Sequence, residues 1–203
     1  MKMRSWWSTV ALLIVLALAV PVGASQTPVV VIQGVDPNTL DPAFFSSTPQ
    51  WTIFAHVFDT LTTMDWETGE ILPALATAWE QLDDVTWRFY LRDDVTFHNG
   101  EPFNAEVVKY NLDRLIDPEI GAFRWFFVDD ADYNEWYVVD EYTIDIITTQ
   151  PSAVVSDMLR LTFMVPKEHY SNTPKEELAR SPVGSGPYKL TEWRRDDRII
   201  LER

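Results

Sequence analysis

The sequence predicts a mixed α/β fold (α+β), because strand and helix patterns follow one another along the chain. Residues 86–91 place apolar side chains at every second position, which is typical of a strand. Residues 104–116 place most of their apolar side chains on one helical stripe. Elsewhere, pairs of short runs rich in β-branched or aromatic residues flank turn sequences, which predicts several hairpins.

The first part of the chain is predicted to hold a strand, a loop, a helix and a hairpin. The β-branched run at residues 28–35 indicates a buried strand, and three prolines with Asp, Asn and Ser make residues 36–49 a loop. Residues 50–61 carry apolar side chains at helical spacing. Residues 61–72 predict a hairpin whose turn, at residues 65–69, ends in a glycine that tolerates a positive φ.

The middle of the chain is predicted to contain a short helical turn at residues 72–79, the strand at residues 86–91 and a longer helix. Asn104 is a good N-cap for this helix, because its side chain can accept a hydrogen bond from an amide of the first turn. Asp117-Pro118 ends the helix near Ile116, because proline disfavours the helical conformation in the residue before it.

The last part of the chain is predicted to hold a hairpin, a helix, a glycine-containing loop and two strands. In order, these are strands at residues 136–139 and 142–148 around a turn at Asp140-Glu141, a helix from Pro151 to about Leu161, a loop at residues 181–186, and strands at residues 188–193 and from Arg198 onward. The last strand reaches Arg203 without a closing turn, so we expect the sequence to be part of a longer protein.

Composition and charge exclude several classes of protein. The 203 residues include 31 acids and 16 bases, for a net charge of −15. This charge excludes nucleic acid and anionic lipid as partners, because phosphate binding needs clustered Lys and Arg. The 46% hydrophobic and 13% aromatic content predicts a packed core. The absence of cysteine excludes disulfides, thiolate metal sites, cysteine nucleophiles and the lipid-modified cysteine of a lipoprotein.

Residues 1–24 have the pattern of a cleavable export signal. Lys2 and Arg4 precede an apolar run at residues 10–22, and small residues at Gly23-Ala24 offer a cleavage site. The alternative is a membrane anchor, but a run of this length spans about 20 Å as a helix, against a hydrocarbon core of roughly 30 Å. We therefore expect an exported protein that works in the periplasm or otherwise outside the cytoplasm.

Motifs for catalysis or metal binding are weak. Asp130, Asp132 and Glu141 imitate the spacing of a calcium loop, but Glu135 occupies the position that needs glycine, and the residues after it predict a strand. The three histidines are scattered singly, and no nucleophile-elbow motif occurs. We expect no catalytic residue, no metal site and no cofactor.

Four segments resemble, in the same order, the family 5 solute-binding proteins of ABC importers, which are extracytoplasmic dipeptide-, oligopeptide- and nickel-binding proteins. The segment LPALATAWEQLDDVTWRFYLRDDVTFHNGEPFNAEVVKYNLDRL, residues 72–115, resembles the signature region of the family. The other three segments are residues 35–65, 138–155 and 181–193. Val107 departs from the pattern, since the family usually has Asp there, and loses about 0.3–1 kcal/mol of helix N-terminal stabilisation.

The resemblance implies a periplasmic-binding-protein-like fold, in which two α/β lobes close on a solute and a third domain is inserted into the first lobe. After the signal at residues 1–24, residues 25–45 would begin the first lobe and residues 46–178 would form the inserted domain. Residues 179–203 would return to the first lobe. Only the N-terminal part of that fold is then present, with the second lobe absent from the sequence, and the full-length protein is expected to be a monomer.

The resemblance also places ligand contacts in three segments: the loop that starts the inserted domain, the segment after the long helix, and the end of the third helix. The candidates are Ser47, Trp51, Arg124, Trp125 and Arg160. An aromatic ring with a cation suits a carboxylate-bearing ligand, through stacking and bidentate hydrogen bonds. The alternative is that the aromatic rings are core and that the arginines pair with the surplus acids.

The function implied is capture of a small solute (a peptide, a metal chelate or an oligosaccharide) and its delivery to the permease subunits of an ABC importer. Two alternatives remain open. One is an exported hydrolase that uses paired carboxylates, although nothing singles out a catalytic pair among the 31 acids. The other is a surface domain that binds a protein partner without any small molecule.

Overall fold

The computed structural model describes residues 34–44, 46–120, 122 and 133–203 of the chain. The export signal predicted at residues 1–24 lies outside the described residues, as does most of the strand predicted at residues 28–35. No helix in the described part is both long enough and apolar enough to cross a membrane.

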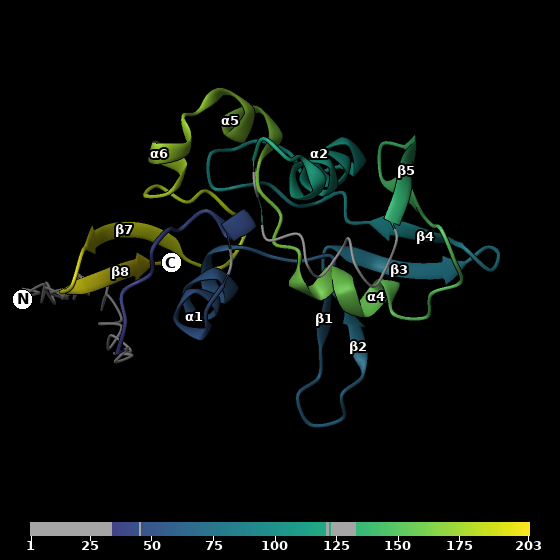
Figure 1. The fold of residues 1–203 in the computed structure, drawn as a ribbon, viewed down its shortest axis with the longest axis horizontal. Helices are drawn as coiled ribbons and strands as arrows, with labels where there is room; N and C mark the ends of the chain where they lie inside the picture. Colours follow the sequence, from purple (N-terminus) through teal and green to yellow (C-terminus); the bar gives the residue numbers. More distant parts are fainter. Residues whose placement is uncertain (1–33, 45, 121, 123–132) are drawn as a thin grey trace, which may run out of the picture. The chain divides into compact units, whose positions relative to one another are not determined.

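A four-stranded antiparallel sheet has the strand order β3-β4-β6-β5 (Figure 1). Its strands are β3 (Ala76–Gln81), β4 (Thr86–Leu91), β5 (Tyr133–Asp140) and β6 (Thr143–Thr148). The strand predicted at residues 86–91 is confirmed, and so is the hairpin predicted around Asp140-Glu141, although its turn lies one residue later, at Glu141-Tyr142. Because β4 pairs with β6, strands that are far apart in sequence share one sheet.

One face of this sheet is apolar and packs against helix α2 (Ala105–Ile116). Phe89 of β4 and Ile144 and Ile146 of β6 are buried in this first core. Arg88 and Asp145 lie on the opposite face, where Arg88 donates two hydrogen bonds of 2.7 and 2.8 Å to the Asp145 carboxylate. The alternation in the sequence therefore corresponds to one buried face and one solvent-facing face.

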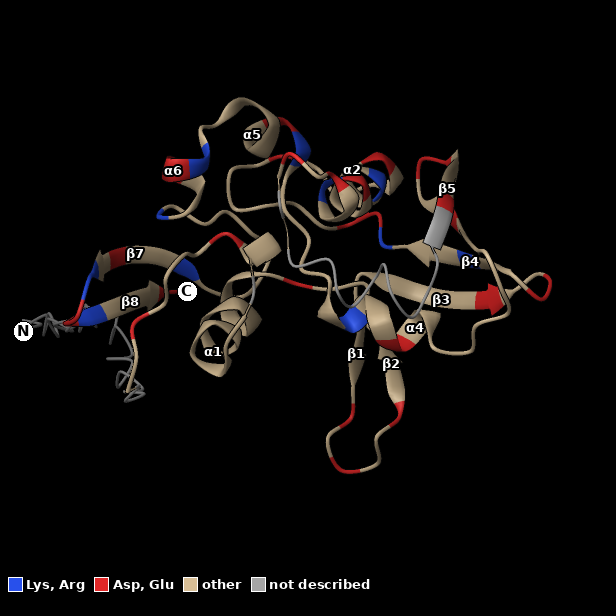
Figure 2. Ribbon diagram, in the orientation of Figure 1, with Lys and Arg blue, Asp and Glu red and all other residues tan. Residues whose placement is uncertain are grey.

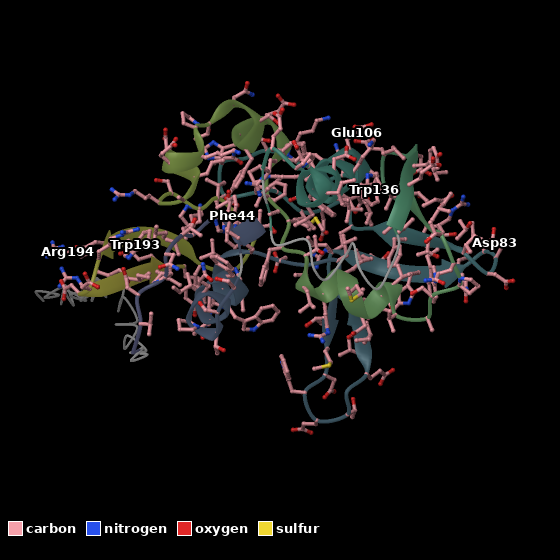
Figure 3. The ribbon with its side chains drawn as sticks, viewed as in Figure 1. Phe44, Asp83, Glu106, Trp136, Trp193 and Arg194 are labelled. Atoms are coloured by element: carbon pink, nitrogen blue, oxygen red, sulfur yellow. The ribbon has the colours of Figure 1, made fainter. Side chains whose placement is uncertain are left out.

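Helix α2 is the predicted longer helix, and both of its ends are confirmed. The Asn104 side chain accepts a hydrogen bond from the Val107 amide at 3.1 Å, as an N-cap does. The helix ends at Ile116, as predicted. Beside it, the Trp136 indole of β5 donates to the Asp113 carboxylate at 2.7 Å, which ties the helix to the sheet (Figure 3).

The helical turn predicted at residues 72–79 is wrong. These residues form most of β2 (Ile71–Pro73) and the first part of β3, which pairs with β4. Ala and Leu favour helices by only a small amount, and strand pairing overrides that preference. The extended conformation also stacks Trp79 on Phe89, with ring centroids 6.1 Å apart, so it is the conformation that covers the indole.

The first predicted hairpin is confirmed as β1 (Thr62–Met64) paired with β2. Its turn is held by Asp65, whose carboxylate accepts hydrogen bonds from the Glu67 and Thr68 amides at 2.8 and 3.1 Å. Gly69 has a φ of 75°, a conformation that glycine adopts without steric cost. Acidic side chains gather at this turn and at the turn between β3 and β4 (Figure 2).

Helix α1 (Thr48–Val57) begins and ends earlier than the helix predicted at residues 50–61. Pro49 fits the first turn, where its missing N–H would have had no partner. After the helix the chain is extended, because the Thr60 and Leu61 carbonyls accept hydrogen bonds from the segment before β3. Leu61 lies in this extended segment and is buried in the first core. The apolar spacing in the sequence therefore extends beyond the end of the helix.

A second core contains α1 and the C-terminal part of the described chain. Its buried members are Leu40, Ile53, Phe54, Val57, Phe58, Phe163, Val165, Tyr170 and Leu178. The antiparallel pair β7 (Lys189–Arg194) and β8 (Arg198–Glu202) contributes partly buried side chains, among them Trp193 (Figure 3). The two strands predicted at this end of the chain are therefore confirmed.

The short helical segments are less well predicted. They are η1 (Pro42–Phe44), α4 (Val155–Met158), η2 (Leu159–Leu161), α5 (Lys167–Asn172) and α6 (Lys175–Leu178). The single helix predicted from Pro151 begins only at Val155 and ends as a 3₁₀ turn. No sequence pattern predicts α5 and α6, because four to six residues are too few to show helical periodicity.

The loop at residues 181–186 approaches the end of α1 so closely that it needs glycine at two positions. A Cβ atom at Gly184 would lie 2.0 Å from the Val57 carbonyl oxygen, and one at Gly186 would lie 2.7 Å from the His56 carbonyl oxygen. Both distances are shorter than a carbon–oxygen contact allows, and the obstructing atoms are backbone. The close approach therefore depends on the missing side chains.

The buried ion pair between Asp41 and Arg114 gives a test of this fold. The two residues are 1% and 7% exposed, so Arg114→Met would leave the Asp41 carboxylate buried without its cation. We expect this change to lower the free energy of unfolding by about 3–5 kcal/mol. Lys109→Met is the matched control on the same helix, since it removes an exposed pair with Asp113 and should cost less than about 1 kcal/mol. Urea denaturation measures both, and equal losses would contradict the assignment.

Candidate functional site

The start of α1 gathers the first predicted contact residues around a buried glutamine. Gln50 is 1% exposed, and its Oε1 accepts hydrogen bonds from the Ser46 amide at 3.0 Å and from the Ser46 and Ser47 hydroxyls at 3.1 Å. Its Nε2 donates to the Thr39 carbonyl at 3.1 Å. One side chain therefore ties the preceding loop to the first turn of the helix.

Trp51 follows Gln50 and lies half-buried at the edge of the second core. Its indole packs against Phe163, with ring centroids 5.1 Å apart and planes at 55°. The rings of Phe54 and Phe58 also pack against Phe163, at 5.6 and 6.1 Å. This aromatic cluster fixes the orientation in which Trp51 presents its exposed surface.

Arg160 lies in η2, three residues before Phe163. Its Nε donates to the Asp157 carboxylate at 2.6 Å, and the Arg160 side chain is 22% exposed. The arginine is thus paired with a neighbouring acid. This agrees with the alternative in which the candidate arginines pair with the surplus acids of the chain.

The other two predicted contacts, Arg124 and Trp125, lie outside the described residues. Of the remaining three, Ser47 and Trp51 share one helical turn. Trp51 also contacts the segment that carries Arg160, through Phe163. The described part of the candidate site is therefore the start of α1 together with residues 160–163.

Gln50 belongs to this site but is not among the residues predicted from the sequence. Ser47-Thr48-Pro49-Gln50 has the S-x-x-Q spacing of a capping box, in which the side chain of the third helical residue reaches back toward the N-cap. That spacing is the signal that could have identified it. In the structure, Gln50 bonds the Ser46 amide, one residue before the N-cap.

Among the described residues, three carboxyl groups have displaced pKa values, and none of them suits acid catalysis. Backbone amides that donate hydrogen bonds lower the pKa of Asp65 and of Asp83. The Arg92 guanidinium lowers the pKa of Asp94 through its hydrogen bonds. A carboxyl group that donates a proton near neutral pH needs a raised pKa, so these three stay ionised.

The described residues offer no cluster of metal-binding side chains. Among residues 34–44, 46–120, 122 and 133–203, no group of three or more His, Cys, Asp or Glu side chains could hold a metal ion. Asp130 and Asp132 of the calcium-like spacing lie outside the described residues. The positions between Glu135 and Asp140 belong to β5, as the sequence predicts, and a strand does not provide the turn that a calcium loop needs.

The described site offers hydroxyl groups and an aromatic ring on a fixed helix start. The Ser46 and Ser47 hydroxyls donate to Gln50, which leaves their oxygen lone pairs as acceptors. Trp51 contributes an indole, a side chain whose ring packs well against apolar and aromatic groups. None of these groups titrates near neutral pH, so the arrangement suits binding by hydrogen bonds and stacking and does not provide an acid–base pair.

Comparison with known proteins matches the chain to one family. The family model described as "Bacterial extracellular solute-binding proteins, family 5 Middle" matches residues 70–203. Among curated relatives, the chain is 30% identical over 207 residues to the "Probable D,D-dipeptide-binding periplasmic protein DdpA" of Escherichia coli (strain K12). The match covers 94% of this chain and 39% of DdpA, so the chain spans about two fifths of the length of that relative.

Solved structures of this kind of protein have the same mixed α/β fold over part of their chains. One is the periplasmic binding protein DppA from Helicobacter pylori in complex with the peptide STSA, at 28% identity and a TM-score of 0.70. Another is NikZ from Campylobacter jejuni in complex with Ni(L-His), at 26% identity and a TM-score of 0.71. The matches cover 83% and 81% of this chain, and 37% and 33% of those chains.

Replacement of Gln50 tests whether this side chain organises the start of α1. Gln50→Ala removes the acceptor shared by the Ser46 amide and two hydroxyls, so we expect a loss of about 1–3 kcal/mol in the free energy of unfolding. We also expect faster amide hydrogen exchange at residues 46–48. Gln81→Ala is the control, because that exposed side chain makes one 3.3 Å hydrogen bond and its loss should cost about 0.5 kcal/mol or less. Unchanged exchange at residues 46–48 would rule out the organising role.

Proposed function

The chain belongs to family 5 of the bacterial extracellular solute-binding proteins, and we propose that it is the solute-binding part of an ABC importer that captures a peptide-like solute. The observation that carries the proposal is the family match over residues 70–203. A relative and a structure similar to this chain are named for dipeptide binding and peptide binding respectively, which supports the solute class. Nickel–histidine is the solute in another similar structure, so a small metal chelate is the second candidate.

Proteins of this family bind solutes and are not enzymes. This argues against the exported hydrolase as an alternative. The lowered pKa values of Asp65, Asp83 and Asp94 agree with that view, since a glycosidase or peptidase with a carboxyl acid needs a raised one.

We extend the proposal to a two-lobe architecture in which this chain supplies one side of the cleft. Residues 25–45 and 179–203 are assigned to the first lobe and residues 46–178 to the inserted domain. The second core supports a close connection of these segments, because it draws Leu40, Phe54 and Tyr170 together with β7 and β8. A solute buried between two lobes loses water on both sides, and such sites cover 70–90% of the surface of a drug-sized ligand.

Closure of the lobes on the solute would determine which form of the protein docks on the membrane subunits of the importer. The solute binds the closed form better, so it shifts an existing open–closed equilibrium toward closure. The partners proposed for the closed form are the permease subunits of the importer. The full-length protein would work outside the cytoplasm as a monomer, with residues 1–24 as its export signal.

Ser47 and Trp51 are the contacts that we propose from the described residues. Trp51 would stack on the solute while Phe163 supports it from behind, and the Ser47 hydroxyl would accept a hydrogen bond from a peptide amide. Asp157 occupies Nε of Arg160, so a solute carboxylate would bind the terminal nitrogens of that guanidinium, which has five N–H donors in all. Arg124 and Trp125 remain proposed contacts from the segment after α2.

Solute binding by the full-length protein tests the proposal. We expect a small peptide such as Ser-Thr-Ser-Ala, or nickel–histidine, to bind without being chemically changed, as measured by calorimetry and by mass analysis of the recovered solute. Trp51→Ala should weaken binding by about tenfold or more, which is about 1.4 kcal/mol. Trp66→Ala is the matched control, because that indole is 75% exposed on the β1–β2 turn and should leave the affinity unchanged.

Two outcomes would contradict solute binding, and a third would contradict only the proposed Trp51 contact. Turnover of the peptide would favour the hydrolase. A protein that binds none of these solutes but retains a protein partner would favour the surface interaction domain. Equal losses in the Trp51 and Trp66 variants would remove Trp51 from the site while leaving the solute-binding function in place.

A further inference from the structure

His98 is bonded on both ring nitrogens and on its backbone to one loop. Its Nε2 lies 2.8 Å from the Gly186 carbonyl oxygen, and its Nδ1 lies 3.4 Å from the Gly184 amide nitrogen. The backbone amide of His98 donates to the Gly184 carbonyl at 2.8 Å. The side chain therefore spans both glycines of the loop at residues 181–186.

These contacts specify one protonation state of the imidazole. The Gly186 carbonyl can only accept, so Nε2 must carry a proton. The Gly184 amide can only donate, so Nδ1 must be unprotonated. Both contacts are satisfied by the neutral Nε2–H tautomer, whereas the imidazolium would point an N–H at another N–H.

The other side of the loop rests on the end of α1. The Gly186 amide donates to the Val57 carbonyl at 2.9 Å, and the Tyr188 amide donates to the His56 carbonyl at 3.1 Å. The Ser185 hydroxyl donates to the Asp59 carboxylate at 2.9 Å. The loop is thus held between His98 and α1, and it leads directly into β7.

The charges around the imidazole come from the elements on both sides of the loop. Burial, the largest cause, lowers the pKa of His98 below its ordinary value of 6.5. The hydrogen bond to Gly186 and the charge of Asp59 oppose this shift in the pKa, while the charge of Lys189 on β7 adds to it. His56 is a second histidine near the loop, and its ring packs against Tyr188, with centroids 5.6 Å apart.

We propose that His98 is a pH-sensitive clamp, which in its neutral form holds the 181–186 loop between the turn after β4 and the end of α1, and which loosens its hold on the loop when it is protonated. Protonation removes the contact at Nδ1, because it turns an acceptor into a donor. The Nε2 contact with Gly186, the backbone bond from His98 to Gly184 and the contacts between the loop and α1 remain, so the loop loosens at the Gly184 amide. The inference rests on the geometry of this loop and does not require the proposed function.

The direction of the pH effect follows from the lowered pKa. Above the ordinary pKa of 6.5 the imidazole is neutral in both the folded and the unfolded chain, and the contribution of the clamp to stability is fully present. As the pH falls below that value, the unfolded chain takes up a proton more readily than the folded chain, so this contribution is lost. Acid therefore loosens the loop.

Amide hydrogen exchange and NMR titration of the full chain test the clamp. After correction for the intrinsic pH dependence of exchange, we expect the protection of the amides of residues 184–186 and 188 to fall several-fold between pH 7.5 and pH 5. His98→Gln keeps a side chain that can donate to Gly186 but does not titrate, so its loop should exchange with the same protection at both pH values. His56→Gln is the matched control and should keep the pH response of the unchanged chain.

Either of two results would overturn the proposal. In the first, the loop of the unchanged chain keeps its protection through the pH at which His98 titrates, as read from the His98 ring protons. In the second, His98→Gln shows the same pH response as the unchanged chain. The first measurement needs no variant, so it decides the matter even where His98→Gln does not fold.

Discussion

Two polar side chains on α2 join the two cores of the described chain. One stripe of the helix, including Val108 and Leu112, is buried in the first core, against the four-stranded sheet. From the same helix, Arg114 pairs with Asp41, and its guanidinium lies 5.1 Å from the centre of the Tyr170 ring in the second core. Asn111 makes two hydrogen bonds to the Val165 backbone, at 2.9 and 3.0 Å. These contacts fix one core relative to the other.

The polar contacts of Arg114 and Asn111 restrict the two cores to one relative arrangement, which apolar packing alone would not do. Apolar surfaces tolerate sliding, whereas a buried carboxylate, guanidinium or amide must keep its partners because an unpaired one costs several kilocalories per mole. Tyr170 is buried beside this ion pair, with the centre of its ring 5.1 Å from the Arg114 guanidinium. Burial raises the pKa of that phenol, so it stays neutral beside Asp41 and Arg114.

What the sequence predicts well is what local periodicity encodes. β4, α2 and the hairpins at β1–β2 and β5–β6 follow from alternation, stripe and turn residues that lie within a dozen positions of one another. Residues 72–79 are predicted wrongly because their Ala and Leu side chains favour a helix only weakly, and pairing with β1 and β4 overrides that preference. The Asp41–Arg114 pair joins positions that no local pattern relates, so among 31 acids nothing marked Asp41 as the buried one.

The candidate site also depends on a contact of Asn111, one of the two polar side chains that join the cores. This explains why only part of the site could be predicted from the sequence. Ser47 and Trp51 are candidates because of the family resemblance, but the orientation of Trp51 is set by Phe163. Phe163 is held by its bridge to Thr60 on one side, and two residues later Asn111 of α2 holds the chain at Val165. The aromatic wall behind Trp51 is therefore positioned by backbone contacts with an extended segment and by a helix of the other core. A surface fixed from two cores keeps its shape when water is removed from it, which is the property that a binding face needs more than any single contact residue.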